Sequence, residues 1–374
     1  MNRTILNRLR QAIRLNLEDK AGQIIKSYGS YLSKRDLTRL IEYMIKIKSY
    51  SYGVIRYIFY VSPHRHVFNP VEHNELLCYT YGYPTIIELL WSDDRVVQEY
   101  LRIEELGAYA HSNIDAHYAA RYVLSYGTSR SSMRFLIDKI RSPYILSYAL
   151  ERAADHGYTD IVAYLFERYS SVLDEQSCNY ALRVASSGGF DSIVSILLKS
   201  GAKVDQYTLD HAMRGACFGG KIGGDTNLKT VRLLLEYLRS DPANRSNNSI
   251  YYACTAINPE PGIVMLLLQD ERIDPRKCDT HPIRSAEKFE IIRILLEDKR
   301  YDTESCIWTI RNLVWRDMDK DEYEKITRLL LTDEAVRAKL KQIQRPDLKQ
   351  IIQSAEDRYP NVASVLAGVQ NEKY

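Results

Sequence analysis

The chain has 374 residues, of which 45% are hydrophobic, and its 51 Lys and Arg against 48 Asp and Glu give a net charge of +3. This mild positive charge falls well short of that of a typical nucleic-acid-binding protein, while the apolar fraction is ordinary for a folded core. No apolar run approaches the length of a transmembrane helix, and we expect no secretory signal because no apolar segment follows the start.

The first predicted element is an N-terminal helix in the basic segment Met1–Leu17, which we expect to cover one end of the fold. A mitochondrial transit peptide is the alternative, and the acidic pair Glu18-Asp19 that follows at once disfavours it. The segments Asp36–Ile47 and Val54–Tyr60 then predict a pair of helices, followed by a loop from Pro63 to Pro70.

A helix–turn–helix unit recurs through the middle of the chain, and its clearest copy is Asn179–Asp205. Gly188-Gly189 permits the turn, and Gly201 ends the second helix in a left-handed cap. The second helix has an apolar stripe at i, i+1, i+4 and i+5, formed by Ile193, Val194, Leu197 and Leu198. The same unit occurs 32 residues earlier around Tyr148 and 31 residues later around His211, where a polar insert precedes the second helix. Two short helices cannot bury their apolar faces alone, so each unit needs neighbours.

Weaker copies extend the pattern in both directions. Towards the N-terminus we predict a copy at Asn74–Trp91, an extra helix at Val96–Leu106 and a degenerate copy with a polar turn at 127–132. Towards the C-terminus, second helices begin near Ile263, Ile291 and Ile326, the last after a charged linker at Arg316–Glu322, and Leu348–Ala355 with Val362–Leu366 form a closing cap. The second-helix starts recur about every 34 residues on average, which fits both ankyrin and tetratricopeptide repeats.

The loops separate these two possibilities. Asp205, Asp241, Asp274 and Asp302 each lie ten or eleven residues after the second apolar residue of a second helix. An ankyrin finger begins at this place, whereas a tetratricopeptide has a tight turn there. We expect each Asp to bond the backbone two residues on.

The pattern A-x-x-x-G-x-x-x-I-V-x-x-L-L with Gly201-Ala202-x-Val204-Asp205 resembles the ankyrin repeat. A Tyr-Ala-Leu opening in place of Thr-Pro-Leu-His is similar to the divergent ankyrin proteins of giant DNA viruses. The resemblance is strong in Tyr148–Asp205 and fair to about Asp302. It implies a viral protein that binds host or viral proteins without catalysis.

Other chemistry has weaker signals. Gly215–Lys221 nearly fits a phosphate-binding loop, but the hydroxyl residue is replaced by Ile222 and the segment is in phase with a repeat helix. His64, His66, His73 and Cys78 match no common zinc spacing. The six cysteines form no CxxC pair, so we expect reduced thiols in a cytoplasmic protein without metal or cofactor. No catalytic constellation or small-molecule site is apparent.

Arg121, Arg183 and Arg214 share one repeat position, which Glu151 holds in the unit between. Stacked repeats would align them in a row, either as structural ion pairs and solvated side chains or as part of a ligand-facing stripe. The resemblance places partner contacts on the finger loops and just before the turn of the first helix. The predicted protein-binding residues are Asp155, His156, Arg183, Ser187, Arg214 and Phe218, with Phe218 as either turn packing or an exposed anchor.

The sequence therefore predicts an all-α, curved solenoid of about ten ankyrin-like repeats with degenerate terminal repeats. We predict four parts: residues 1–73 as a cap and degenerate repeat, 74–143 as divergent repeats, 144–302 as well-formed repeats, and 303–374 as degenerate repeats and a cap. The expected function is a non-enzymatic scaffold that binds a host or viral protein through the concave face. The alternative is a nucleotide- or nucleic-acid-binding protein that uses Gly215–Lys221 or the Arg row.

Overall fold

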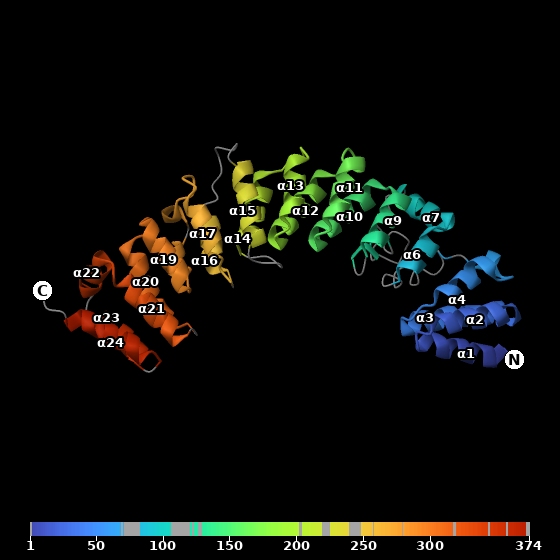
Figure 1. Cartoon of the computed structure of the whole chain (residues 1–374), viewed down its shortest axis with the longest axis horizontal. Coiled ribbons are helices and arrows are strands. Elements are labelled where there is room, and N and C mark those ends of the chain that lie inside the picture. Colours follow the sequence, from blue (N-terminus) through green and yellow to red (C-terminus); the bar gives the residue numbers. More distant parts are fainter. Residues whose placement is uncertain are drawn as a thin grey trace. The chain divides into compact units, whose positions relative to one another are not determined.

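The structure is a computed structural model that describes residues 2–68, 70, 83–105, 120–121, 123–125, 129–201, 204–218, 225–238, 248–256, 258–278, 280–316, 319–342, 345–356 and 358–371. Throughout these residues the secondary structure is helical, without a β-strand, which confirms the predicted all-α class (Figure 1). The chain forms two compact units, Met1–Cys178 and Asn179–Tyr374. The predicted division into four parts stays a prediction.

The first unit begins with two stacked helix pairs, since α1 contacts α2 and α3, and α2 contacts α4. The N-terminal helix predicted in Met1–Leu17 is present as α1. A second helix, α2, was not predicted, and the acidic residues at 18 and 19 lie in its first turn, where they suit the helix dipole. The predicted extra helix is present as α7. Bounds are α1 (Asn2–Arg14), α2 (Glu18–Tyr28), α3 (Lys34–Ile47), α4 (Tyr52–Arg56), a π-helical turn (Tyr57–Val61), α6 (Pro84–Trp91), α7 (Asp94–Glu105), α9 (Arg130–Ile140), α10 (Pro143–His156) and α11 (Thr159–Tyr169). Short 3-10 turns lie at Gly29–Tyr31 and Arg65–Val67.

The first helices predicted around Cys78 and Tyr118 lie outside the described residues, apart from short stretches at 120–121 and 123–125. Their second helices are present as α6 and α9, which pack against each other.

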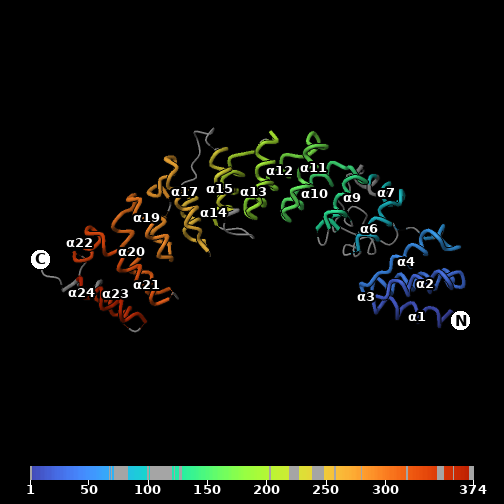
Figure 2. The backbone as a smooth tube through the Cα atoms, viewed as in Figure 1, coloured from blue at the N-terminus to red at the C-terminus, as the bar shows by residue number. Residues whose placement is uncertain are grey.

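The second unit consists of two layers of helices that alternate along the chain (Figures 1 and 2). In the first layer α14, α16, α18, α20 and α22 contact one another in sequence, and in the second layer α13, α15, α17, α19 and α21 do the same. Bounds are α12 (Glu175–Gly188), α13 (Asp191–Lys199), α14 (Gln206–Phe218), α15 (Asp225–Leu238), α16 (Asn248–Thr255), α17 (Pro261–Leu268), a 3-10 turn (Pro275–Lys277), α18 (Pro282–Ser285), α19 (Phe289–Asp298), α20 (Thr303–Leu313), α21 (Lys320–Leu330), α22 (Glu334–Gln342), α23 (Arg345–Glu356) and α24 (Pro360–Asn371). The first helix that precedes α19 is the short α18, and α22 was not predicted.

The apolar stripe of α13 forms the core where the sequence places it. Ile193 and Val194 are fully buried and Leu197 is nearly so, while Leu198 is only half-buried. Gly189 and Gly201 both adopt φ of +74°, the left-handed conformation that glycine enters without steric cost. The turn and the cap predicted at these two positions are confirmed.

Two of the recurring aspartates, Asp205 and Asp302, cap helices. Asp205 accepts a hydrogen bond from the Thr208 N–H at 2.6 Å, three residues on, and Asp302 accepts one from Ser305 at 2.7 Å. Each carboxylate thus satisfies a free N–H at the start of α14 or α20. Asp274 bonds Arg276 at 3.0 Å, two residues on, as the sequence predicts, and Asp241 lies outside the described residues.

A second motif, Asp-x-Arg, follows three of the second helices at a constant spacing. Its aspartates at 93, 270 and 298 each come seven residues after the first apolar residue of the helix, at 86, 263 and 291. In each copy the aspartate accepts hydrogen bonds from the arginine two residues on, and the arginine also donates to a carbonyl of an earlier element: Arg95 to Phe68 at 3.2 Å, Arg272 to Leu235 at 3.1 Å and Arg300 to Leu268 at 2.6 Å. The motif therefore ties successive helix pairs together within each unit.

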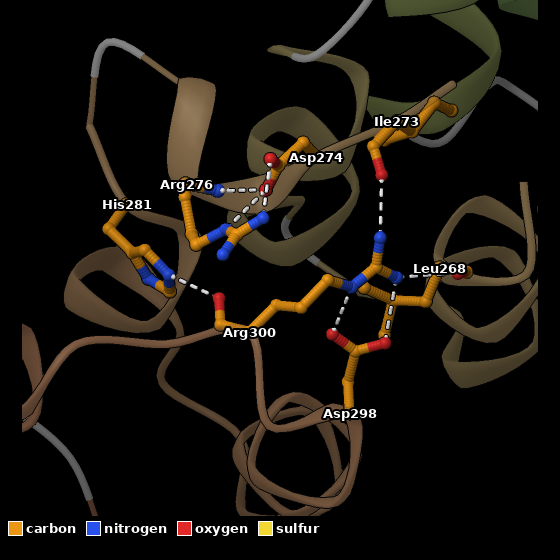
Figure 3. A network of polar contacts seen from close by, with 7 residues as sticks. All are labelled: Leu268, Ile273, Asp274, Arg276, His281, Asp298 and Arg300. Carbon is orange, nitrogen blue, oxygen red and sulfur yellow. Dashed lines mark hydrogen bonds and ion pairs between the residues drawn. The ribbon is translucent and has the colours of Figure 1, made fainter. Parts of the chain in front are cut away.

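Among the described residues, Arg300 donates more side-chain hydrogen bonds than Arg95 or Arg272, and Figure 3 shows its contacts. Its guanidinium donates to both carboxylate oxygens of Asp298 at 2.7 and 2.8 Å and to two carbonyls, those of Leu268 and Ile273, at 2.6 and 3.0 Å. Leu268 ends α17, so its carbonyl lacks an intrahelical partner. The planar guanidinium group of arginine suits this site because its N–H groups point in fixed directions. One side chain can therefore satisfy the Asp298 carboxylate and both carbonyls.

His281 links the same region to the start of α18. Its Nδ1 accepts from the Ile283 N–H at 3.3 Å and its Nε2 lies 3.1 Å from the Arg300 carbonyl, so the neutral imidazole donates from Nε2 (Figure 3). Burial lowers the pKa of His281, and the Arg284 charge acts in the same direction, while the hydrogen bond to Arg300 and the charges of Asp302 and Asp274 oppose them.

We expect the stability of wild-type protein to fall between pH 7.5 and pH 5 because of His281. The folded chain binds this proton less well than the unfolded chain, whose histidine pKa is about 6.5, so stability is lost as pH falls through that value and towards the lower folded pKa. His281→Asn keeps a capping oxygen but has no titrating group, and its urea unfolding midpoint should change less over this range. An equal pH dependence in the two proteins would contradict this assignment.

Candidate functional site

A row of arginine and aromatic side chains runs along the first layer of the second unit. In this arginine–aromatic row, defined as Arg183, Tyr207, Arg214, Tyr252, Arg284 and Trp308, each arginine faces an aromatic ring of a following helix in that layer. The guanidinium carbon lies 6.0 Å from the ring centre for Arg183 and Tyr207, 5.5 Å for Arg214 and Tyr252, and 5.9 Å for Arg284 and Trp308. These distances are those of cation–π contacts.

The local sequence produces the row because the arginine falls three residues after an aromatic or histidine residue, on the same helix face. This pairing occurs at Tyr180 with Arg183, at His211 with Arg214, and at His281 with Arg284. Trp308 and Arg311 repeat it in α20. In α16 the arginine is replaced by Thr255, whose hydroxyl donates to the Tyr251 carbonyl at 3.0 Å.

Two arginines of the row, Arg183 and Arg214, have no acidic partner among the described residues. Within the described part of the chain, neither Arg183 nor Arg214 forms an ion pair, and the buried Nε of Arg183 has no hydrogen-bond partner. Arg214 instead lies 2.9 Å from Nδ1 of His211, which accepts this hydrogen bond when neutral. Partial burial, with the positive charges of Arg214 and Arg183, lowers the pKa of His211. The row is therefore aromatic and positively charged at neutral pH.

Several aromatic rings of this surface are open to solvent. Tyr207 is 62% exposed and Trp308 is 38% exposed. Phe218, the last residue of α14, is 45% exposed, so it is not packed away in the turn. Exposed Tyr, Trp and Arg are the residues that most often carry binding energy in protein interfaces.

The structure places the six predicted residues in both units. Arg183, Ser187, Arg214 and Phe218 belong to α12 and α14 of the second unit, and Ser187 and Gly215 mark where these helices approach closely: a Cβ on Gly215 would lie 3.0 Å from that of Ser187. Asp155 and His156 lie in α10 of the first unit, where Asp155 is 3.7 Å from the Arg152 guanidinium. His156 contacts the Arg152 carbonyl through Nδ1 at 2.8 Å.

The same stacking occurs in the first unit. Arg121 lies 4.7 Å from the ring centre of Tyr148 and 5.7 Å from that of Tyr144. Glu151, which holds the arginine position in the next unit of the sequence, accepts from the Ser177 hydroxyl at 2.9 Å. The sequence left open whether these arginines form ion pairs or are solvated. In the structure they stack on aromatic rings, and these stacking partners were not predicted.

The structure adds little support for the other candidate sites that the sequence suggests. Residues 215–218 of the phosphate-loop pattern are the last turn of α14, and residues 219–221 lie outside the described residues. His73 and Cys78 also lie outside them, and the described residues contain no group of three His, Cys, Asp or Glu side chains able to hold a metal. Among the described residues, Cys178, Cys217, Cys254 and Cys306 form no disulfide, and burial raises the pKa of Cys178 to about 11. Among the described helices, none is both long and apolar enough to cross a membrane.

Comparisons with known proteins found no matching family model, no matching curated protein and no matching solved structure.

Proposed function

We propose that this chain is an ankyrin-like repeat scaffold that binds another protein through the arginine–aromatic row. The row is the observation that carries the proposal. It combines exposed aromatic rings, which bury a large apolar area at low entropic cost, with Arg183 and Arg214, which form no ion pair in the described part of the second unit.

Repetition of the helix pair supports the scaffold part of the proposal. The two layers of the second unit, the left-handed glycines at 189 and 201 and the period near 34 residues fit an array in which each repeat packs on its neighbours. The sequence resemblance to viral ankyrin proteins supports a host or viral protein as the partner, in the cytoplasm of the host cell. Such a scaffold needs no cofactor and performs no catalysis.

The partner chemistry follows from the row. Arginines that stack on rings keep the edges of their guanidinium groups available, and these edges bind carboxylates in a bidentate manner. We therefore propose a partner surface with acidic residues beside apolar ones.

A pull-down from cell lysate tests this proposal. Immobilised wild-type protein is compared with an Arg183→Glu, Arg214→Glu, Phe218→Ala triple variant and with Arg232→Glu, an exposed arginine of α15 in the other layer. We expect a protein captured by wild type and Arg232→Glu and lost from the triple variant, because charge reversal repels an acidic partner. Equal capture by all three proteins, each with unchanged helical circular dichroism, would contradict the proposal.

Single-stranded nucleic acid is the second candidate because arginines interleaved with rings also stack bases. Nuclease treatment of the lysate and a salt series separate the two. Nucleic-acid binding predicts affinity that falls steeply with salt, by a slope of about one counterion per neutralised phosphate, whereas a protein partner predicts a shallower dependence.

A further inference from the structure

A pocket lies between α23 and α20, the helix that carries Trp308, the last ring of the arginine–aromatic row. The pocket has a volume of about 280 Å³ and is lined by Arg311, Val314, Trp315, Gln350, Ile351 and Ser354. Sites for drug-sized ligands usually measure about 300–1,000 Å³, so this one suits one or two side chains of a partner better than a cofactor.

Arg311 differs from the other arginines of the first layer. It follows Trp308 by three residues, as Arg183 follows Tyr180, but no aromatic ring of a later helix lies over it among the described residues. Within that part of the chain its guanidinium also forms no ion pair, and its buried Nε has no hydrogen-bond partner. A half-buried cation without a partner is costly, and a carboxylate that forms paired hydrogen bonds with it would offset that cost.

Trp315 forms the second half of the pocket. At 69% exposure it is the most exposed large hydrophobic residue of those described. The pocket floor beside it is apolar, since Val314 is 1% and Ile351 7% exposed. An exposed indole beside an apolar floor binds another apolar or aromatic side chain, and tryptophan is among the commonest anchors of interfaces.

We infer that this pocket binds a segment of a partner protein in which an acidic residue adjoins an aromatic residue. The carboxylate binds Arg311, and the aromatic ring packs on Trp315 and supplies the stacking partner that Arg311 lacks. Because α20 contacts α18 within the same layer, the pocket continues the arginine–aromatic row. The inference rests on the proposed function and names the chemistry of its partner at one end of the row.

Selection of random displayed peptides on the full-length protein tests the inference, because it needs no identified partner. We expect wild type to enrich peptides with Asp or Glu next to Phe, Tyr or Trp. Trp315→Ala and Arg311→Gln should not enrich this motif, and in fluorescence polarisation they should bind the enriched peptide about tenfold or more weakly. Arg328→Gln, an exposed arginine of α21, should bind it as wild type does.

The inference is overturned if no acidic–aromatic motif is enriched, if the motif survives in both pocket variants, or if a single-stranded oligonucleotide binds the pocket instead. Trp315 is exposed, so Trp315→Ala should keep the fold, which circular dichroism checks. The two proposals fail separately: a lysate partner lost from the Arg183 and Arg214 variant but kept by Trp315→Ala supports the function and rejects the pocket. If a selected peptide needs Trp315 for binding but no lysate partner depends on Arg183 and Arg214, the pocket is supported and the proposed function is rejected.

Discussion

Arg300→Ala is expected to lower the opening free energy of the α17–α19 region by about 2–4 kcal/mol, because two carbonyls and a carboxylate lose their shared charged donor. The carbonyls of Leu268 and Ile273 lie 2.6 and 3.0 Å from the guanidinium, and Asp298 is paired with it. Hydrogen exchange of the full chain measures this local opening.

Arg276→Ala is the matched control for Arg300→Ala, since Arg276 pairs with Asp274 in the same Asp-x-Arg geometry (Figure 3). Its side chain is 62% exposed, and within the described part of the chain its guanidinium donates to Asp274 and to no carbonyl of another helix pair. We therefore expect little change for Arg276→Ala. Equal protection factors in the two variants would show that the carbonyl contacts of Arg300 do not hold the helix pairs together.

Tyr323→Ala should destabilise the C-terminal helices by about 3–5 kcal/mol, the usual cost of removing a large buried aromatic side chain. Tyr323 is fully buried in α21, its hydroxyl donates to the Ile310 carbonyl at 2.9 Å, and its ring meets that of Tyr359 edge to face at 4.7 Å. Tyr359 in turn donates to the Arg316 carbonyl at 2.8 Å. The two rings thus join the start of α24 to α20 and α21.

A milder variant separates the ring from the hydroxyl. Tyr323→Phe keeps the ring and should cost only about 1–2 kcal/mol for the unpaired carbonyl. Tyr207→Ala, an exposed tyrosine of the same unit, should change stability by no more than about 0.5–1 kcal/mol. Protection of α24 amides that is the same in Tyr323→Ala and in wild type would contradict the role of this ring in closing the unit.

The second helices could be predicted from the sequence because an apolar stripe at i, i+1 and i+4 is a local signal. Two helices escaped the same argument: α2 buries only Ala21 and Ile25, and α22 only Val336 and Leu340. Two buried apolar residues give a helix only a weak periodic pattern in the sequence. These helices are fixed by packing against neighbours, which a single segment does not reveal.

The site was predicted in part. The shared arginine position is visible in the sequence, but the rings that Arg183, Arg214 and Arg284 contact lie in the next helix of the layer and depend on how repeats stack. Trp315 and Arg311 meet α23 only in the folded unit. The Asp-x-Arg motif was not predicted, although its spacing from the apolar pair is constant, because the spacing alone does not show that its arginines reach carbonyls of an earlier element.

Site-specific cross-linking would test the binding surface most directly. A photoreactive benzoylphenylalanine is placed at Tyr207 of α14 in one protein and at Arg232 of α15 in another, and partners captured on illumination are identified by mass spectrometry. We expect the partner to cross-link at position 207 and not at position 232. Cross-links at 232 with none at 207 would show that the partner binds the other layer.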